Sequence, residues 1–96
     1  AANDEPGARD ASRARALLDP AAALPPRAET VALADAVAIA SSKHGRTPAG
    51  GALARTAADL RARLFRADHT AADAREALEL YGAAAGVHDE AGCAAQ

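Results

Sequence analysis

The chain has 96 residues and a net charge of −2, and alanine fills 32 positions while leucine, isoleucine, valine and phenylalanine together fill only 14. This length fits one domain, the weakly acidic balance argues against strong non-specific binding to nucleic acid, and no apolar run reaches the ~18 residues of a membrane span. Because alanine has the highest helix propensity, we expect an all-α fold of about four helices around a thin core.

The first predicted helix spans about residues 9–19 and follows a frayed N-terminus over residues 1–8. Its apolar stripe ends with Leu17 and Leu18, which lie at helical spacing from the alanines before them. Pro20 disfavours the helical conformation of the residue before it and should end the helix. A connector rich in proline then leads to the second element.

The second predicted helix spans about residues 27–43, although its pattern is ambiguous. Its large apolar residues fall on alternating positions, as in a strand: Val31, Leu33, Val37 and Ile39. A strand over residues 30–41 would place alanine along its other face, and alanine is depleted in strands. We favour a helix and leave the strand open as the alternative. Such a helix would be apolar on nearly all sides, which predicts a central, buried position.

The third predicted helix has the clearest pattern. Thr47 and Pro48 are typical of an N-cap followed by the first helical residue. An apolar seam then repeats at heptad-like spacing: Leu53, Ala57, Leu60 and Leu64. We predict that this seam is an interaction surface, and that the helix forms an antiparallel hairpin with the fourth. Its opposite face is a possible charged contact face: Arg55, Arg63 and Arg66.

The fourth predicted helix begins near Thr70, where Asp73 three residues later resembles a capping box. One face should carry its apolar residues: Ala74, Ala77, Leu78 and Tyr81. Gly82 or Gly86 is expected to end the helix. A single helical domain would therefore cover residues 9–86, with a mobile C-terminal tail over residues 87–96.

A possible anion-binding site precedes the third helix. Lys43, His44 and Arg46 are cationic or titratable residues beside the expected free N–H groups of a helix N-terminus. The spacing of a phosphate-binding P-loop is missing, and an ordinary interhelical turn is the alternative.

Catalytic and metal-binding residues are not predicted. The serines carry no motif of an activated nucleophile, so we expect no enzymatic activity and no cofactor. Four potential metal ligands cluster near the C-terminus without the spacing of a zinc site: His88, Asp89, Glu90 and Cys93.

These observations predict a non-enzymatic helical interaction module, such as an adaptor, docking domain or regulatory subunit. Self-association is expected because the large apolar residues are too few to cover four helices. The alternative is a small nucleic-acid-associated regulator that uses the arginine face of the third helix. The alanine and arginine bias is typical of bacterial proteins, and we expect a cytoplasmic protein that does not bind membranes, with secretion after removal of a leader as the alternative.

Overall fold

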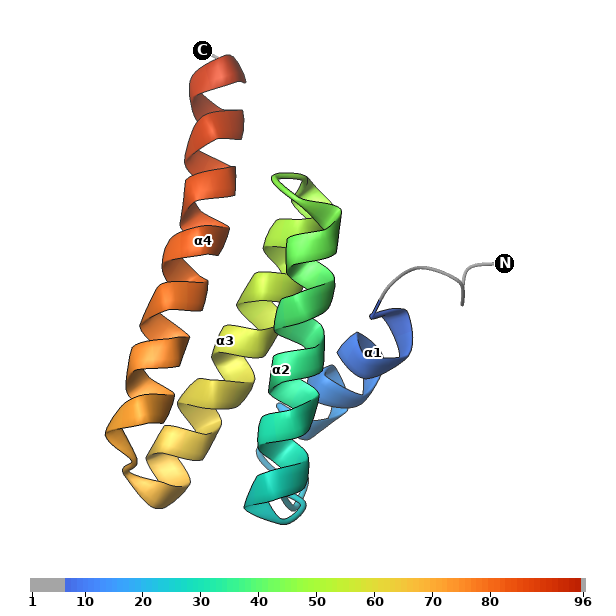
Figure 1. The fold of residues 1–96 in the computed structure, drawn as a ribbon, viewed down its shortest axis with the longest axis vertical. Coiled ribbons are helices and arrows are strands. Elements are labelled where there is room, and N and C mark those ends of the chain that lie inside the picture. Colours follow the sequence, from blue (N-terminus) through green and yellow to red (C-terminus); the bar gives the residue numbers. More distant parts are fainter. Residues whose placement is uncertain (1–6, 96) are drawn as a thin grey trace.

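Four helices make up the part of the chain described by the computed structural model, which covers the backbone of residues 7–95 and the side chains of residues 7–85. The helices follow in the order α1 (Ala8–Leu17), α2 (Arg27–His44), α3 (Pro48–Asp68) and α4 (Ala71–Ala95) (Figure 1). No strand occurs among these residues. The predicted all-α array is therefore confirmed, and the ambiguous residues 30–41 are helical.

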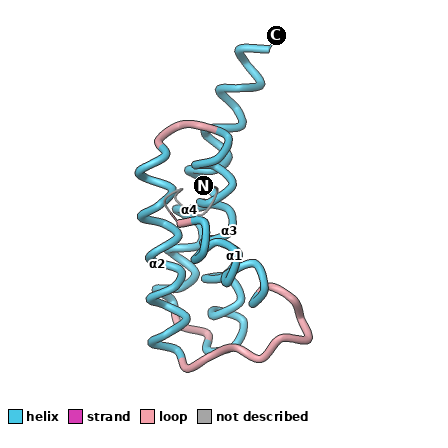
Figure 2. Tube along the Cα trace, turned by 90° about the vertical axis from the view of Figure 1, so that its right-hand side faces the viewer, coloured by secondary structure: helices cyan, strands magenta, loops and turns pink. Residues whose placement is uncertain are grey.

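Helix α1 begins directly after Gly7, whose φ of 77° lies in the left-handed region that favours glycine. A Cβ atom at Gly7 would lie only 2.3 Å from the Cβ of Ala40 on α2, so glycine also allows the two helices to approach closely. The buried residues of α1 are Ala11 and Ala14. The connector between α1 and α2, residues 18–26, runs outward and returns along one end of the molecule, as the long pink segment at the lower right of Figure 2 shows.

Helix α2 is buried on one side only, contrary to the expectation that nearly all its sides are covered. Its buried face contains Thr30, Leu33, Ala34, Val37 and Ala40. Ile39 leaves 58% of its surface exposed although its neighbour Ala40 is buried. The strand-like alternation of large side chains therefore does not define the buried face, because alanines complete a helical stripe instead.

The central helix is α3 and not α2, which corrects the predicted arrangement. Helix α3 packs against each of the other three helices, and Figure 1 shows it between α2 and α4. Its buried residues lie on more than one side, because alanines such as Ala54 and Ala58 add a second apolar face to the seam around Leu60. Thr47 caps this helix as predicted, since its side-chain oxygen accepts a hydrogen bond from the backbone N–H of Gly50 at 3.1 Å.

Helices α3 and α4 form the predicted antiparallel hairpin, joined at His69, whose φ is 55°. The predicted end of α4 is wrong, because the helix continues past Gly82 and Gly86 to Ala95 and extends beyond the other helices (Figure 1). Each glycine lowers the stability of the helix by about 1 kcal/mol relative to alanine, and the high helix propensity of the alanines on both sides outweighs this loss. The predicted mobility of residues 87–96 stays a prediction.

The core is dominated by small side chains, as the composition predicts. Among the side chains that the structure describes, the large apolar residues that are fully buried are Leu60, Leu64 and Val37. No described helix combines the length and the apolar character needed to cross a membrane.

Candidate functional site: an ion-pair network and the outer face of α4

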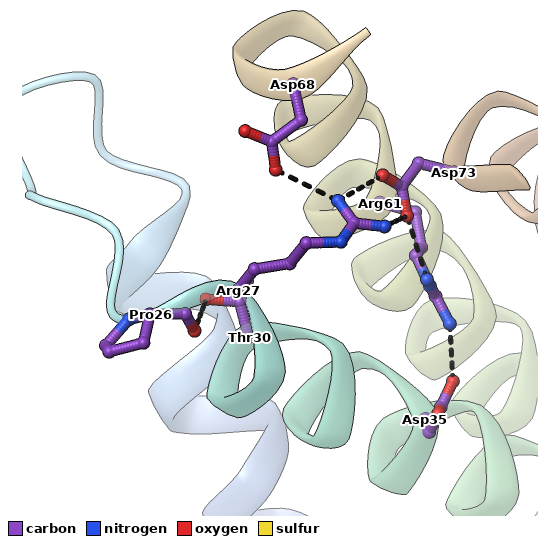
Figure 3. A network of polar contacts seen from close by, with 7 residues as sticks. All are labelled: Pro26, Arg27, Thr30, Asp35, Arg61, Asp68 and Asp73. Carbon is purple, nitrogen blue, oxygen red and sulfur yellow. Dashed lines mark hydrogen bonds and ion pairs between the residues drawn. The ribbon is translucent and has the colours of Figure 1, made fainter. Parts of the chain in front are cut away.

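An ion-pair network joins α2, α3 and α4 (Figure 3), and it lies toward the end of the molecule where the chain turns from α3 into α4 (Figure 1). At its centre, Asp73 of α4 is fully buried. Arg27 of α2 donates to both carboxylate oxygens of Asp73, at 2.7 and 3.1 Å, and Arg61 of α3 donates to one of them at 2.9 Å. Arg27 also pairs with Asp68 at 2.9 Å and Arg61 with Asp35 at 2.7 Å. We call these five residues the Asp73 network.

The charge of Asp73 is stabilised by its partners. Burial raises the pKa of this carboxyl group, but the hydrogen bonds from Arg27 and Arg61 outweigh that effect and hold the pKa below its usual value. Hydrogen bonds to Asp73 and Asp68 raise the pKa of Arg27 in turn. Asp73 is therefore ionised at neutral pH with both oxygens engaged, an arrangement suited to holding helices together and not to general acid–base chemistry.

The network also determines which face of α4 is buried. The predicted capping box is wrong, because the Asp73 side chain points between the helices toward the two arginines. Ala77 lies one turn further along the same face and is buried as well. The predicted apolar face, with Leu78 and Tyr81, is consequently turned partly outward.

The predicted charged contact face of α3 is divided between two roles. Arg55 and Arg66 are exposed, as expected. Arg63 is partly buried, and its guanidinium donates to the carbonyl oxygens of Leu17 and Ala22 and, at 2.8 Å, to that of Asp19. Arg63 therefore fastens the connector to α3, so the three arginines do not form one free surface.

The predicted interaction seam of α3 lies inside the molecule. Leu53, Ala57, Leu60 and Leu64 are each at most 9% exposed. Three of them belong to the same cluster as the buried residues of α1 and α2. The seam is already covered by this chain's own helices, which corrects the prediction that it receives a partner.

The predicted anion site lies at the turn between α2 and α3, and one of its three residues lines a pocket. Arg46 lines a pocket of about 250 Å³ between the end of α2, the start of α3 and Gly82 of α4, whereas Lys43 and His44 do not. The backbone N–H of Gly50 at the α3 N-terminus already donates a hydrogen bond to the side chain of Thr47, so it is not free to bind an anion. A Cβ atom at Gly50 would lie 2.3 Å from the carbonyl oxygen of Gly45, so this glycine is explained by close helix packing rather than by ligand binding.

The outer face of α4 carries two exposed large apolar side chains. Leu78 is 72% exposed and Tyr81 37% exposed. The hydroxyl of Tyr81 donates a hydrogen bond to Asp59 on α3. Burial, with a contribution from this bond, raises the pKa of Tyr81 to about 12. Tyr81 is therefore a neutral donor at physiological pH, held in a defined orientation beside the free side chain of Leu78.

Metal ligands do not cluster within the described side chains: no group of three or more His, Cys, Asp or Glu residues there could hold an ion. The C-terminal set of His88, Asp89, Glu90 and Cys93 lies outside the side chains that the structure describes.

The chain matches no protein-family model, no curated protein and no solved structure. Function is therefore inferred from the residues and their surroundings.

The Asp73 network is the feature that sequence reasoning missed. Its arginine–aspartate pairs join residues that are 12 to 46 positions apart, so no local motif connects them. One signal was present: Arg61 directly follows the seam residue Leu60, on the apolar side of α3 and not on the face of Arg55. A charged residue beside a core position indicates a partner of opposite charge on a neighbouring helix.

Proposed function

We propose that the chain is a non-enzymatic helical interaction module, an adaptor or regulatory docking domain, and that it binds protein through the outer face of α4. This proposal moves the binding surface from α3, whose seam is buried, to α4. The single observation that carries it is the 72% exposure of Leu78 beside Tyr81.

Three properties of this face favour protein binding. Tyrosine is among the residues enriched at protein interfaces, and the largely exposed Leu78 beside it adds apolar surface that a partner could bury. Tyr81 is oriented by Asp59 before any partner arrives, so less side-chain freedom is lost on binding. The face belongs to the longest of the described helices, and its described part extends over about four turns from Ala71 to Ala85.

Alternative functions receive less support from the residues. In the arginine face proposed to bind nucleic acid, Arg63 is engaged in hydrogen bonds to the connector. Asp59 lies between the other two arginines, Arg55 and Arg66, in the sequence. The buried carboxylate Asp73 has both oxygens engaged. A bacterial, cytoplasmic setting remains part of the proposal on the basis of composition alone.

Site-specific photocrosslinking tests the proposal. A photoreactive phenylalanine derivative replaces Leu78 in one sample and Ser12, an exposed residue of α1, in the matched control. Both proteins are irradiated alone and in extract of the producing cell. We expect a discrete protein adduct from position 78 and none from position 12. Absence of any protein adduct from position 78, or equal adducts from both positions, would contradict the proposal.

A further inference from the structure

Helix α4 carries a second seam at heptad spacing, which we call the outer seam: Ala71, Ala74, Leu78, Tyr81 and Ala85. Its members are exposed except for Ala74, which is partly buried. The helix packs onto α3 with a different stripe, which includes the buried Asp73 and Ala77. Heptad spacing of this kind lets one helix pack along another over several turns. Within the described part of the chain, no second helix covers the outer seam.

The side-chain sizes along the outer seam match an antiparallel copy of the same seam. If a twofold axis passes at Leu78, the two leucines face each other, Ala71 faces Ala85, and Tyr81 of each copy lies within one residue of the level of Ala74 of the other. Each large side chain beyond the axis then meets a small one, which is how well-packed layers interdigitate. A parallel pair would instead set Tyr81 against Tyr81 and leave the alanine layers unfilled.

Charges beside the outer seam are complementary under the same axis. The short turn between Asp68 and Ala71 and the hydrogen bond from Tyr81 to Asp59 place Ala62 of α3 about level with Leu78 of the antiparallel α4. The axis then passes beside Ala62 and brings Arg66 of one copy level with Asp59 of the other, within one residue. Arg66 is exposed and makes no ion pair within the described residues. The symmetry repeats this opposite-charge pairing on both sides of the axis.

We propose that the partner of the outer seam is a second copy of this chain, with α4 packed antiparallel against α4 and the twofold axis at Leu78. The inference rests on the proposed function, because it identifies the occupant of the same surface. It accounts for the outward position of a leucine in a chain with few large apolar residues, since the dimer would bury that leucine. It also predicts a closed dimer and not a longer assembly, because an isologous contact uses the same face of both copies.

The first test is the mass in solution, measured by sedimentation over a range of protein concentrations. We expect the parent to approach twice its 9.6 kDa monomer mass at high concentration. Leu78→Glu should raise the dissociation constant at least about a hundredfold, because two leucines are lost and each buried leucine is worth roughly a factor of ten. Ile39→Glu is the matched control, since Ile39 is also exposed but lies on α2, and it should leave the mass unchanged.

The second test is the register, in a Cys93→Ser background that removes the natural thiol. Ala71→Cys and Ala85→Cys proteins should form a covalent dimer on mild oxidation when mixed, and little when oxidised separately. Self-linking of Ala71→Cys alone would indicate a parallel pair and overturn the antiparallel register. Circular dichroism of each variant checks that the helices are retained.

The outcomes separate this inference from the proposed function. A parent that stays monomeric at every concentration overturns the second copy as partner. If position 78 then crosslinks to a different protein, the interaction module stands with another occupant. A dimer that Leu78→Glu leaves intact overturns the outer seam as its interface.

Discussion

Helices α3 and α4 each carry a seam at heptad spacing, but the two seams have opposite surroundings. On α3 the seam residue Leu60 is completely buried, whereas on α4 the corresponding large residue, Leu78, is 72% exposed. Spacing therefore identifies which residues share a helical face and leaves open whether this chain or another molecule covers that face. In this protein one seam forms the core and the other remains available.

The difference between the seams has an electrostatic cause. Asp73 can be buried only beside its arginine partners, because an unpaired buried carboxylate would be costly. Its pairing with Arg27 and Arg61 fixes the rotation of α4 about its own axis. Alanines on the same face, such as Ala77, allow the close approach that these short ion pairs require. A leucine is turned outward as a consequence.

The largest expected effect comes from a substitution in the buried seam of α3. Leu60→Ala should lower the free energy of unfolding by about 2–5 kcal/mol, because a fully buried leucine leaves both lost burial and a cavity. Leu24→Ala in the connector should cost less, since Leu24 is only partly buried. Leu78→Ala should change the stability of the monomer by no more than about 0.5 kcal/mol. Urea unfolding at low protein concentration measures all three, and coincident midpoints would contradict the assignment of core and outer seam.

The next effect concerns the network that orients α4. Arg61→Leu should lower the free energy of unfolding by about 3 kcal/mol, because Asp73 stays buried with Arg27 as its remaining partner. The double variant Arg61→Leu/Asp73→Leu should recover part of this loss, since it removes the buried charge as well. If the double variant is less stable than Arg61→Leu alone, the cost arises from packing and not from the charge.

A smaller effect is expected from acid. The folded pKa of Asp73 is lowered below its ordinary value of 3.8, so the folded state binds fewer protons than the unfolded state in this range. Its contribution to stability is full above about pH 5 and is lost as the pH falls through 3.8 toward the lowered folded pKa. Unfolding free energies measured between pH 6 and pH 2 should fall less steeply in Arg61→Leu/Asp73→Leu than in the parent. Parallel curves would show that other carboxyl groups cause the acid sensitivity.

Local signals predicted the helices well but not their mutual arrangement. Pro26 precedes α2, and Thr47 with Pro48 begins α3, so short-range capping chemistry places both starts correctly. The central position of α3 could not be predicted in this way, because it depends on alanines that look alike on every face. The same uniformity left the buried face of α4 open, since only the distant partners of Asp73 distinguish it.

The candidate site was predicted in part. The predicted exposure of Arg55 and Arg66 is confirmed, because neither lies near an apolar seam position. Arg63 looked identical to them in sequence, and its role depends on a connector more than 40 residues away, as its hydrogen bond to Asp19 shows. Leu78 and Tyr81 were predicted to share a face, but a helical pattern contains no information on which side of the helix a neighbour lies.

The smallest expected effect tests whether the arginines beside the outer seam face protein or nucleic acid. Each phosphate contact by an arginine steepens the salt dependence of duplex binding by about 0.9 in logarithmic slope, so two contacts by Arg55 and Arg66 would give a slope near −1.8. We expect no such slope, because Asp59 carries a negative charge on the same flank and Arg63 is held by the connector. Titrations of fluorescent duplex and single-stranded DNA at low salt should therefore coincide for the parent and for Arg55→Gln/Arg66→Gln. Arg63 stays intact in this variant so that the connector remains fastened. Salt-dependent DNA binding by the parent that disappears in the double variant would assign this side of the hairpin to nucleic acid. Titration curves that show no binding by either protein would leave the outer seam as a protein-binding surface.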